Sequence, residues 1–223
     1  MKTNLISGML ICGIEESGRG PVIGPMIMCG CMIKEEDEPN LVKLGVKDSK
    51  LLTHKKREFL FDKIKKICRY KIIIVEPTEI DGALLSDDLN LNWLEAVKSA
   101  EIINELQPDK AIIDSPSNNV DKYKRYVKKL LNKDIEIVVE HKADVNYPIV
   151  SAASILAKVT REIEVAKIKK KIGADFGSGY SSDPQTRDFV EKHHSEYPGI
   201  FRETWSTHRI AKEMKNQKKL EEF

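Results

Sequence analysis

The sequence predicts an α/β fold, in which a mixed five-stranded sheet is flanked by helices and followed by a helical C-terminal annex. Three apolar, strand-like runs come first along the chain, and a helix–strand–helix–strand order follows them. After the last of these strands, only helical patterns remain. Consecutive strands favour a meander, whereas strands separated by helices favour crossover connections, so the two parts together predict a mixed sheet.

Each element follows from local composition. Apolar and β-branched runs predict strands at 9–15, 22–33, 70–76, 111–114 and 135–140. Three-to-four spacing of apolar residues predicts helices after Thr53, a suitable N-cap, and at 91–106 and 122–132. Pro148 suits the start of a long helix that ends at Gly173. Asp183 and Pro184 suit the start of another helix, and the last one begins near residue 204.

Composition is that of an intracellular protein, and we expect a cytoplasmic location. The 223 residues are 41% hydrophobic and 32% charged, the mean hydropathy is −0.38, and no apolar run could span a bilayer. The four cysteines lie in apolar contexts without Cys-x-x-Cys spacing, which predicts buried, reduced thiols. The net charge of +2 does not indicate a nucleic-acid partner. Lysine clusters at 122–129 and 167–171 are typical of solvated helix faces, although some of these lysines could contact phosphates.

Two adjacent carboxylates, Glu15 and Glu16, end the first apolar run and precede Ser17-Gly18-Arg19-Gly20-Pro21. Neighbouring side chains can serve one site only where a strand ends and bends, and the two glycines allow that bend. Arg19 carries a fixed charged fork that suits phosphate. The alternative is a surface turn with solvated glutamates, and residue types alone do not decide between the two.

Asp114 ends the strand at 111–114, and Asp144 precedes the long helix. Ligands of such sheets gather beyond strand ends, where Glu15, Glu16 and these two aspartates could meet. Four ionised carboxylates need cations nearby, and oxygen ligands suit Mg²⁺ or Mn²⁺. Two such ions could promote an in-line phosphoryl displacement. The alternatives, which the residues by themselves favour, are a turn-forming Asp114 and a helix-capping Asp144.

The stretch from Glu15 to Pro25 resembles the N-terminal signature of type 2 ribonucleases H, which usually reads Asp-Glu-Ala/Ser-Gly-Arg-Gly-Pro. Glu15 is a departure, because the family has Asp there. Further similarities follow in the family's order along nearly the whole chain: Lys47–Lys50, Ile112–Asp114, His141–Asp144 with Tyr147-Pro148, Ser151–Lys158, and Gly177–Tyr180 with Asp183-Pro184. The last of these resembles the archaeal and eukaryotic branch more than the bacterial one.

The resemblance implies a ribonuclease H-like catalytic domain at 1–173, with a helical annex at 174–216 packed on it. It also implies an endonuclease that hydrolyses the RNA strand of RNA–DNA hybrids and incises DNA duplexes 5′ of an embedded ribonucleotide. The products would be 3′-hydroxyl and 5′-phosphate ends. The role of the enzyme would be ribonucleotide excision repair during DNA replication. Catalysis would depend on two Mg²⁺ or Mn²⁺ ions held by Glu15, Glu16, Asp114 and Asp144.

Substrate binding is implied for three parts of the chain. The backbone of Gly18, Arg19 and Gly20 would contact the 2′-hydroxyl that distinguishes RNA from DNA. Tyr180 would stack on the neighbouring sugar, and its alternative is a packed loop tyrosine. A phosphate-contacting loop would contain Lys47, Ser49 and Lys50, and its alternative is a solvated turn.

Two other functions remain open at this point. A type 3 ribonuclease H also has Ser at the position of Ser17, but it typically has Lys where this chain has Arg19. A catalytically weak hybrid-binding protein is the second alternative, because Glu15 replaces the usual Asp. Metal-dependent cleavage of a duplex that carries one ribonucleotide would separate an enzyme from a binding protein.

The last seven residues, 217–223, resemble the peptide with which DNA-repair enzymes dock on the replication sliding clamp. Gln217, Leu220 and Phe223 have the spacing Gln-x-x-Leu-x-x-aromatic. One helical turn would place Leu220 and Phe223 on the same side as an apolar plug. The alternative is a charged helix end in which this spacing arises by chance.

Overall fold

The computed structural model describes residues 8–46 and 52–221, with side chains up to Met214. It confirms the mixed five-stranded sheet, whose strand order is β3-β2-β1-β4-β5. The strands are β1 (Leu10–Ser17), β2 (Met26–Lys34), β3 (Arg69–Val75), β4 (Lys110–Asp114) and β5 (Glu136–Glu140). β4 pairs in parallel with both β1 and β5, in a register that joins Ile14 to Ile113 and Ile113 to Val139.

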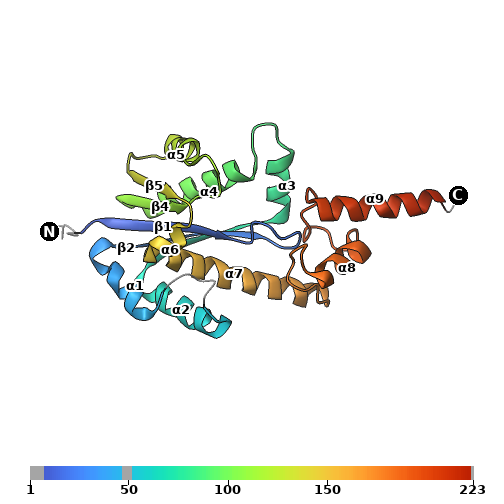
Figure 1. The fold of residues 1–223 in the computed structure, drawn as a ribbon, viewed down its shortest axis with the longest axis horizontal. Coiled ribbons are helices and arrows are strands. Elements are labelled where there is room, and N and C mark those ends of the chain that lie inside the picture. The colour runs from blue at the N-terminus through green and yellow to red at the C-terminus, as the bar shows by residue number, and fades with distance from the viewer. Residues whose placement is uncertain (1–7, 47–51, 222–223) are drawn as a thin grey trace. The chain divides into compact units, whose positions relative to one another are not determined.

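Helices flank the sheet, with α4 and α5 on one side and α1, α2 and α7 on the other (Figure 1). The helical elements are η1 (Glu35–Asp37), α1 (Glu38–Leu44), α2 (His54–Ile67), α3 (Pro77–Leu85), α4 (Leu91–Leu106), α5 (Val120–Lys129), α6 (Ala143–Asn146), α7 (Pro148–Ile172), α8 (Pro184–His193) and α9 (Ser206–Glu221). No described helix is long and apolar enough to cross a membrane.

The predicted helix starts are confirmed by their capping contacts. The Thr53 hydroxyl accepts a hydrogen bond from the Lys56 N–H at 3.3 Å, at the start of α2. Asp183 caps α8 by accepting from the Gln185 N–H at 3.0 Å. These bonds satisfy amides that a helix leaves unpaired in its first turn.

The predicted strand at 22–33 starts too early. β2 begins at Met26, and Ile23 makes only an isolated antiparallel bridge with Phe201. Gly24, at φ 89°, takes the chain out of the extended conformation before Pro25. Val22 and Ile23 are apolar because they are fully buried in a core cluster, not because they continue the strand.

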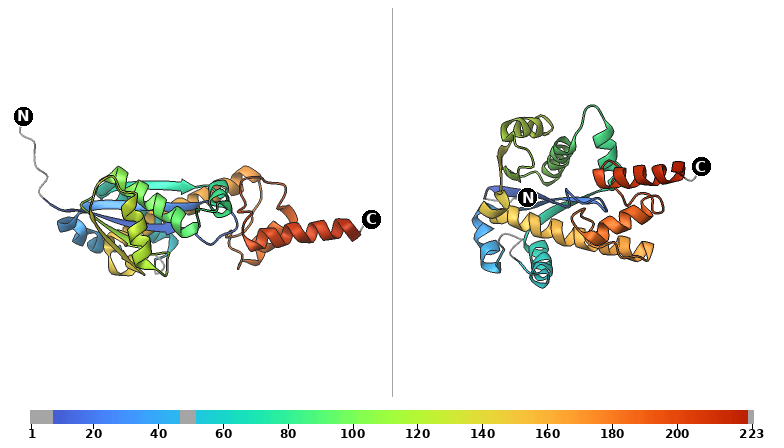
Figure 2. Two further views of the ribbon diagram at one scale, coloured as in Figure 1. Left: turned by 90° about the horizontal axis from the view of Figure 1, so that it is seen from above. Right: turned by 45° about the vertical axis from the view of Figure 1, so that its right-hand side comes forward.

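The chain forms two compact units, each assembled from separate segments. Unit 1 comprises Met1–Glu16, Met28–Ile73 and Glu95–Val159, whereas unit 2 comprises Ser17–Ile27, Ile74–Leu94 and Thr160–Phe223. In unit 2, α8 and α9 pack on each other (Figure 2). The buried core of unit 2 includes Phe176, Phe189 and Phe201. The expected division at 173/174 and 216/217 stays a prediction.

In unit 1, Gly13 of β1 lies against the first turn of α7. A Cβ at this position would come within 2.6 Å of the Ile149 carbonyl oxygen and would overlap the Val150 nitrogen. Real Cβ atoms do not approach backbone atoms this closely, so the contact requires glycine. The strand that carries Glu15 and Glu16 is therefore in direct backbone contact with α7.

Candidate active site

The four predicted carboxylates line one depression in unit 1, with a volume of about 520 Å³. Glu15 and Glu16 come from β1, Asp114 from β4, and Asp144 from α6. The remaining lining residues are Ser115, Asn118, His141 and Lys142. The structure thus brings together side chains from three separate parts of the chain, as the sequence predicts.

Parallel pairing explains how β1 and β4 contribute to the same site. Since Ile14 pairs with Ile113, Glu15 and Asp114 are the next residues of two adjacent strands. Side chains at matching positions of parallel strands point to the same face. Glu15 and Asp114 therefore lie side by side, and the Asp114 carboxylate is one of the groups that raise the pKa of Glu15.

Asp144 is placed by the turn that precedes it. Lys142 has a left-handed backbone conformation, with φ 60°, and its N–H donates to Oδ1 of Asp114 at 3.0 Å. Asp144 is the second residue of α6 and only 4% exposed, so it is not the N-cap of a helix. Its backbone carbonyl accepts a hydrogen bond from the Ser151 hydroxyl at 2.8 Å. These two contacts hold the start of α6 in place.

The electrostatics of the depression disfavour four bare carboxylates. Burial raises the pKa of Glu15 well above its ordinary value, and the charges of Glu16, Asp114 and Asp144 raise this pKa further. The Oε2 atom of Glu15 is buried and has no hydrogen-bond partner among the described residues. Buried polar atoms normally have a partner, so this oxygen fits the position of a cation ligand.

The donor set is composed of carboxylate oxygens, which suits hard divalent cations such as Mg²⁺ and Mn²⁺. Within the described ranges, no group of three or more His, Cys, Asp or Glu side chains is already arranged to hold a metal ion. The four carboxylates instead share an open depression, in which like charges repel one another. The residues present fit a site that accepts cations and substrate from the same open side.

Sequence reasoning did not assign the remaining lining residues. Ser115 directly follows Asp114, and its hydroxyl donates to the Ser117 carbonyl at 3.0 Å, which shapes the turn after β4. His141 and Lys142 precede Asp144, and both are exposed. Their position within the motif His141–Asp144 is the only feature of the sequence that points to this site, because exposed basic residues usually belong to solvated surfaces.

The Gly-Arg-Gly loop belongs to unit 2. Gly18 has φ 83°, as the predicted bend requires, and a Cβ there would lie 2.5 Å from Cδ of Arg161. The Arg19 guanidinium donates to the Asn92 side-chain oxygen at 2.7 Å. The loop is thus bent and its arginine is held at a fixed position.

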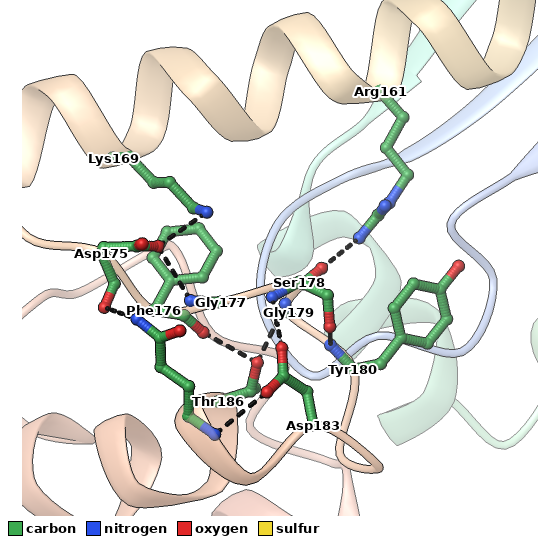
Figure 3. Close-up of polar contacts among 11 residues, drawn as sticks. Arg161, Lys169, Asp175, Phe176, Gly177, Ser178, Gly179, Tyr180, Asp183 and Thr186 are labelled. Carbon is green, nitrogen blue, oxygen red and sulfur yellow. Dashed lines mark hydrogen bonds and ion pairs between the residues drawn. The ribbon is translucent and has the colours of Figure 1, made fainter. Parts of the chain in front are cut away.

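Tyr180 is also in unit 2, beside Gly20, where a Cβ would lie 3.8 Å from Cε1 of its ring. The guanidinium of Arg161 lies 4.9 Å from the ring centroid and donates to the Ser178 carbonyl at 3.0 Å (Figure 3). Tyr180 remains 38% exposed. One face of the tyrosine therefore has a cationic partner, while part of its surface stays open to a ligand.

The loop that carries Tyr180 is fixed by α8. The Ser178 N–H donates to Asp183 at 2.7 Å, and the Gly179 N–H donates to the Thr186 hydroxyl at 3.0 Å (Figure 3). Hydrogen bonds from Ser178, together with those from the backbone N–H groups of Gln185 and Thr186, lower the pKa of Asp183, because they stabilise its charged form. The Asp183 side chain therefore serves both the cap of α8 and the loop.

Some predicted site residues are beyond what the structure describes. Lys47, Ser49, Lys50 and Phe223 lie outside the described residues. Gln217 and Leu220 fall within α9, three residues apart on one helix. Their predicted contacts with phosphate and with a clamp stay predictions.

Comparison with known proteins agrees with this fold. The family Ribonuclease HII matches residues 12–208 of the chain. A ribonuclease HII from Pyrococcus furiosus is 45% identical over 217 residues, which cover 95% of this chain and 95% of that one. The crystal structure of ribonuclease H2 from Pyrococcus horikoshii OT3 has a TM-score of 0.84 and 42% identity, over 92% of this chain and 98% of that one.

A third relative is the ribonuclease HII in the structure of a PCNA:RNase HII complex from Archaeoglobus fulgidus. It has a TM-score of 0.81 and 40% identity, over 89% of this chain and 96% of that one. The matched region contains the β1 carboxylates, Asp114 and Asp144. The chain therefore belongs to the ribonuclease HII family, metal-dependent endoribonucleases that hydrolyse the RNA strand of RNA–DNA hybrids.

Proposed function

We propose that this protein also incises DNA duplexes 5′ of a single embedded ribonucleotide, leaving 3′-hydroxyl and 5′-phosphate ends. Glu15, Glu16, Asp114 and Asp144 act as its catalytic metal ligands. The observation that carries this proposal is the shared depression lined by all four carboxylates, with a buried oxygen of Glu15 that lacks a partner. A site with this donor set supports phosphodiester hydrolysis rather than chemistry on a protein nucleophile.

The four carboxylates would hold two Mg²⁺ or Mn²⁺ ions. When bound, these ions supply activation of a water and stabilisation of charge on the leaving oxygen. The protein contributes the orientation of its ligands, since Asp114 binds the backbone that leads to Asp144. Lys142 adds a positive charge to the lining, which favours the approach of a phosphate.

Recognition of the ribonucleotide is assigned to unit 2. Backbone amides of Gly18, Arg19 and Gly20 contact the 2′-hydroxyl, and Tyr180 stacks on the adjacent sugar. The close position of Gly20 and Tyr180 supports this division of roles, because both would touch neighbouring parts of one substrate. Lys47, Ser49 and Lys50 contact phosphates.

A hybrid-binding protein with little activity is the competing function, because Glu15 is longer than the usual Asp. The position of Glu15 supports the enzyme, since its side chain lines the same depression as the other three carboxylates. The type 3 alternative finds no support, because the family that the chain belongs to is ribonuclease HII.

The test is cleavage of a labelled DNA duplex that carries one ribonucleotide, with Mg²⁺, with Mn²⁺ and with EDTA. We expect one cut on the 5′ side of the ribonucleotide with either metal and none with EDTA. Asp144→Asn is the matched control, because it removes a charge while keeping the shape of the side chain. Binding without cleavage under all conditions would favour the hybrid-binding protein.

We further propose that residues 217–223 dock on the replication sliding clamp through Gln217, Leu220 and Phe223. The complex of PCNA with the ribonuclease HII from Archaeoglobus fulgidus supports this partner. Gln217 and Leu220 lie on one helix at the required spacing. Clamp docking would bring the enzyme to newly replicated DNA.

We also propose a cytoplasmic location. The four cysteines, Cys12, Cys29, Cys31 and Cys68, are free and buried. Free thiols persist in reducing compartments, which supports this proposal. Fractionation of the source cells would test it.

A further inference from the structure

We propose that Arg202 is a positioning residue that turns the peptide N–H groups of the Gly-Arg-Gly loop toward the ribonucleotide. The inference rests on the proposed role of this loop and extends it, because it names the group that sets the loop's orientation. Arg202 lies near the C-terminal end of the chain, 183 and 184 residues from the Arg19 and Gly18 carbonyls that it contacts. All residues in this arrangement belong to unit 2.

The guanidinium of Arg202 is fully buried, and each of its three nitrogens donates to a backbone carbonyl of the loop region. Nη2 donates to the Gly18 carbonyl at 2.5 Å and Nη1 to the Arg19 carbonyl at 2.7 Å. Nε donates to the Gly24 carbonyl at 3.1 Å. Hydrogen bonds from a charged donor are stronger than neutral ones, so these three hold the loop firmly.

A neighbouring side chain completes the set. The indole N–H of Trp205 donates to the Gly20 carbonyl at 3.0 Å. The ring of Trp205 also lies beneath the Arg202 guanidinium, at 4.9 Å from ring centroid to Cζ. The carbonyls of Gly18, Arg19 and Gly20 are therefore all directed toward this Arg–Trp pair.

Peptide geometry then sets the direction of the amides. In a planar trans peptide group, the N–H points away from the C=O of the same group. The carbonyls of Gly18 and Arg19 share peptide groups with the N–H groups of Arg19 and Gly20. Since Arg202 binds these carbonyls, the two amides face the opposite side. Donation to a carbonyl also polarises its peptide group, which makes the N–H a stronger donor.

The backbone around Arg202 is fixed to the same loop region. The Arg202 N–H donates to the Val22 carbonyl at 2.9 Å, and the Gly24 N–H donates to the Ile200 carbonyl at 2.8 Å. Asp81 binds the following turn, where its carboxylate accepts from the Thr204 N–H at 3.1 Å. Arg202 is thus anchored on both sides.

Only arginine offers this contact pattern. Its planar fork carries donors on three nitrogens, whereas a lysine has a single nitrogen that cannot reach three separated carbonyls in the same way. Arg202→Lys therefore keeps the buried charge and loosens the orientation of the loop. Arg209→Lys is the matched control, because Arg209 is an exposed arginine of α9, in the same unit.

The experiment separates reading of the ribonucleotide from general binding. For each protein, kcat and KM are measured on a duplex with one ribonucleotide. The matching all-DNA duplex is then added as a competitor of that cleavage, which gives its inhibition constant, Ki. We expect Arg202→Lys to lower kcat/KM about tenfold, as for the loss of one well-placed hydrogen bond, and to leave Ki unchanged. Arg209→Lys should change neither quantity.

Trp205→Phe is the second variant, for the case that Arg202→Lys fails to fold. It keeps an aromatic ring against the guanidinium and removes the donor to Gly20, so a smaller fall in kcat/KM at constant Ki is expected. Unchanged kcat/KM in a folded Arg202→Lys, or in Trp205→Phe if it alone folds, would overturn the inference. An equal change in kcat/KM and 1/Ki would also overturn the inference, because it would show that the substitution acts only through the structure of the protein and weakens all binding equally. Wild-type protein that cleaves long hybrids but not the single-ribonucleotide duplex would overturn the proposed function itself.

Discussion

Asp114 accepts a hydrogen bond from the backbone N–H of Lys142 at 3.0 Å, so the end of β4 is joined directly to the turn before α6. Asp114 thus has two roles that its side chain could perform separately. In the first role, the side chain accepts a hydrogen bond that holds the segment carrying Asp144. In the second role, it places a negative charge in the depression.

Two substitutions of Asp114 separate these roles. Asn keeps an oxygen in place to accept the Lys142 N–H, whereas Ala removes both the acceptor and the charge. We expect both variants to lose at least about a hundredfold in kcat, since a metal ligand is lost. Only Asp114→Ala should lose its hydrogen bond, which makes it about 1 kcal/mol less stable to urea unfolding in EDTA than Asp114→Asn. Equal stability of the two variants would show that the bond to Lys142 contributes nothing.

Glu15→Asp is expected to raise kcat. The extra methylene of Glu15 displaces its carboxylate by about one bond length, and displacements near 1 Å can cost about a hundredfold in rate. Steady-state cleavage of the single-ribonucleotide duplex measures the change, with the conservative Glu213→Asp on α9 as control. A slower Glu15→Asp enzyme would mean that the site has adapted to glutamate.

Stability without metal should depend on pH through Glu15. Its pKa in the folded protein is raised by burial and by neighbouring charges, so the folded state holds this proton at pH values where the unfolded state has released it. Stability from this group is complete below the ordinary glutamate pKa, and it is lost as the pH rises toward the folded pKa. We expect the Tm in EDTA to fall between pH 5 and pH 8, and to fall less in Glu15→Gln.

Added Mg²⁺ should reverse much of this loss in the wild type, because a bound cation neutralises the ionised carboxylates. Glu213→Gln, which changes an exposed glutamate, should retain the wild-type pH dependence. A pH profile of Tm that is the same in Glu15→Gln and in the wild type would contradict the raised pKa.

Tyr180→Ala should weaken cleavage at a lone ribonucleotide more than it weakens binding to duplex DNA. Stacking positions the sugar, whereas general binding depends on contacts with phosphates. Tyr180→Phe is the matched control, since it keeps the ring that faces Arg161. Comparing kcat/KM with the Ki of an all-DNA duplex measures both effects. Equal losses, or none, would assign Tyr180 a structural role.

Deletion of residues 217–223 should abolish clamp binding and leave cleavage of short duplexes unchanged. The reason is that the deleted residues contain all three proposed docking side chains and none of the four carboxylates. Isothermal titration with the sliding clamp measures the first effect, and the cleavage assay measures the second. Leu220→Ala is a milder variant that should weaken binding without shortening the chain. Full clamp affinity in the truncated protein would refute the docking motif.

The strands that position the carboxylates could be predicted because their signal is local. Short apolar runs ending in Glu15 and Asp114 appear as strands in the structure, with the acidic residues at their ends. The error at Val22 and Ile23 has a physical cause, since a buried apolar pair has the same composition whether it extends a strand or fills a core cluster.

The long-range contacts within each unit could not be predicted in this way. Arg202 reaches Gly18 across 184 residues of chain, and the Lys142 N–H that binds Asp114 belongs to the backbone, which every sequence has. A buried arginine has no local pattern that distinguishes it from an exposed one. Such pairings depend on tertiary structure, and composition or periodicity carries no signal for them.

Gly13 limits how the amino-acid sequence of this enzyme can vary, because glycine has no side chain. Where β1 meets α7, the separation is fixed by main-chain atoms alone, so repacking the surrounding apolar residues would leave the spacing of strand and helix unaltered. Homologues and designed variants should thus be free to exchange many core side chains without moving Glu15 relative to α7. The same freedom does not extend to position 13, where even one methyl group would push the helix away from the strand.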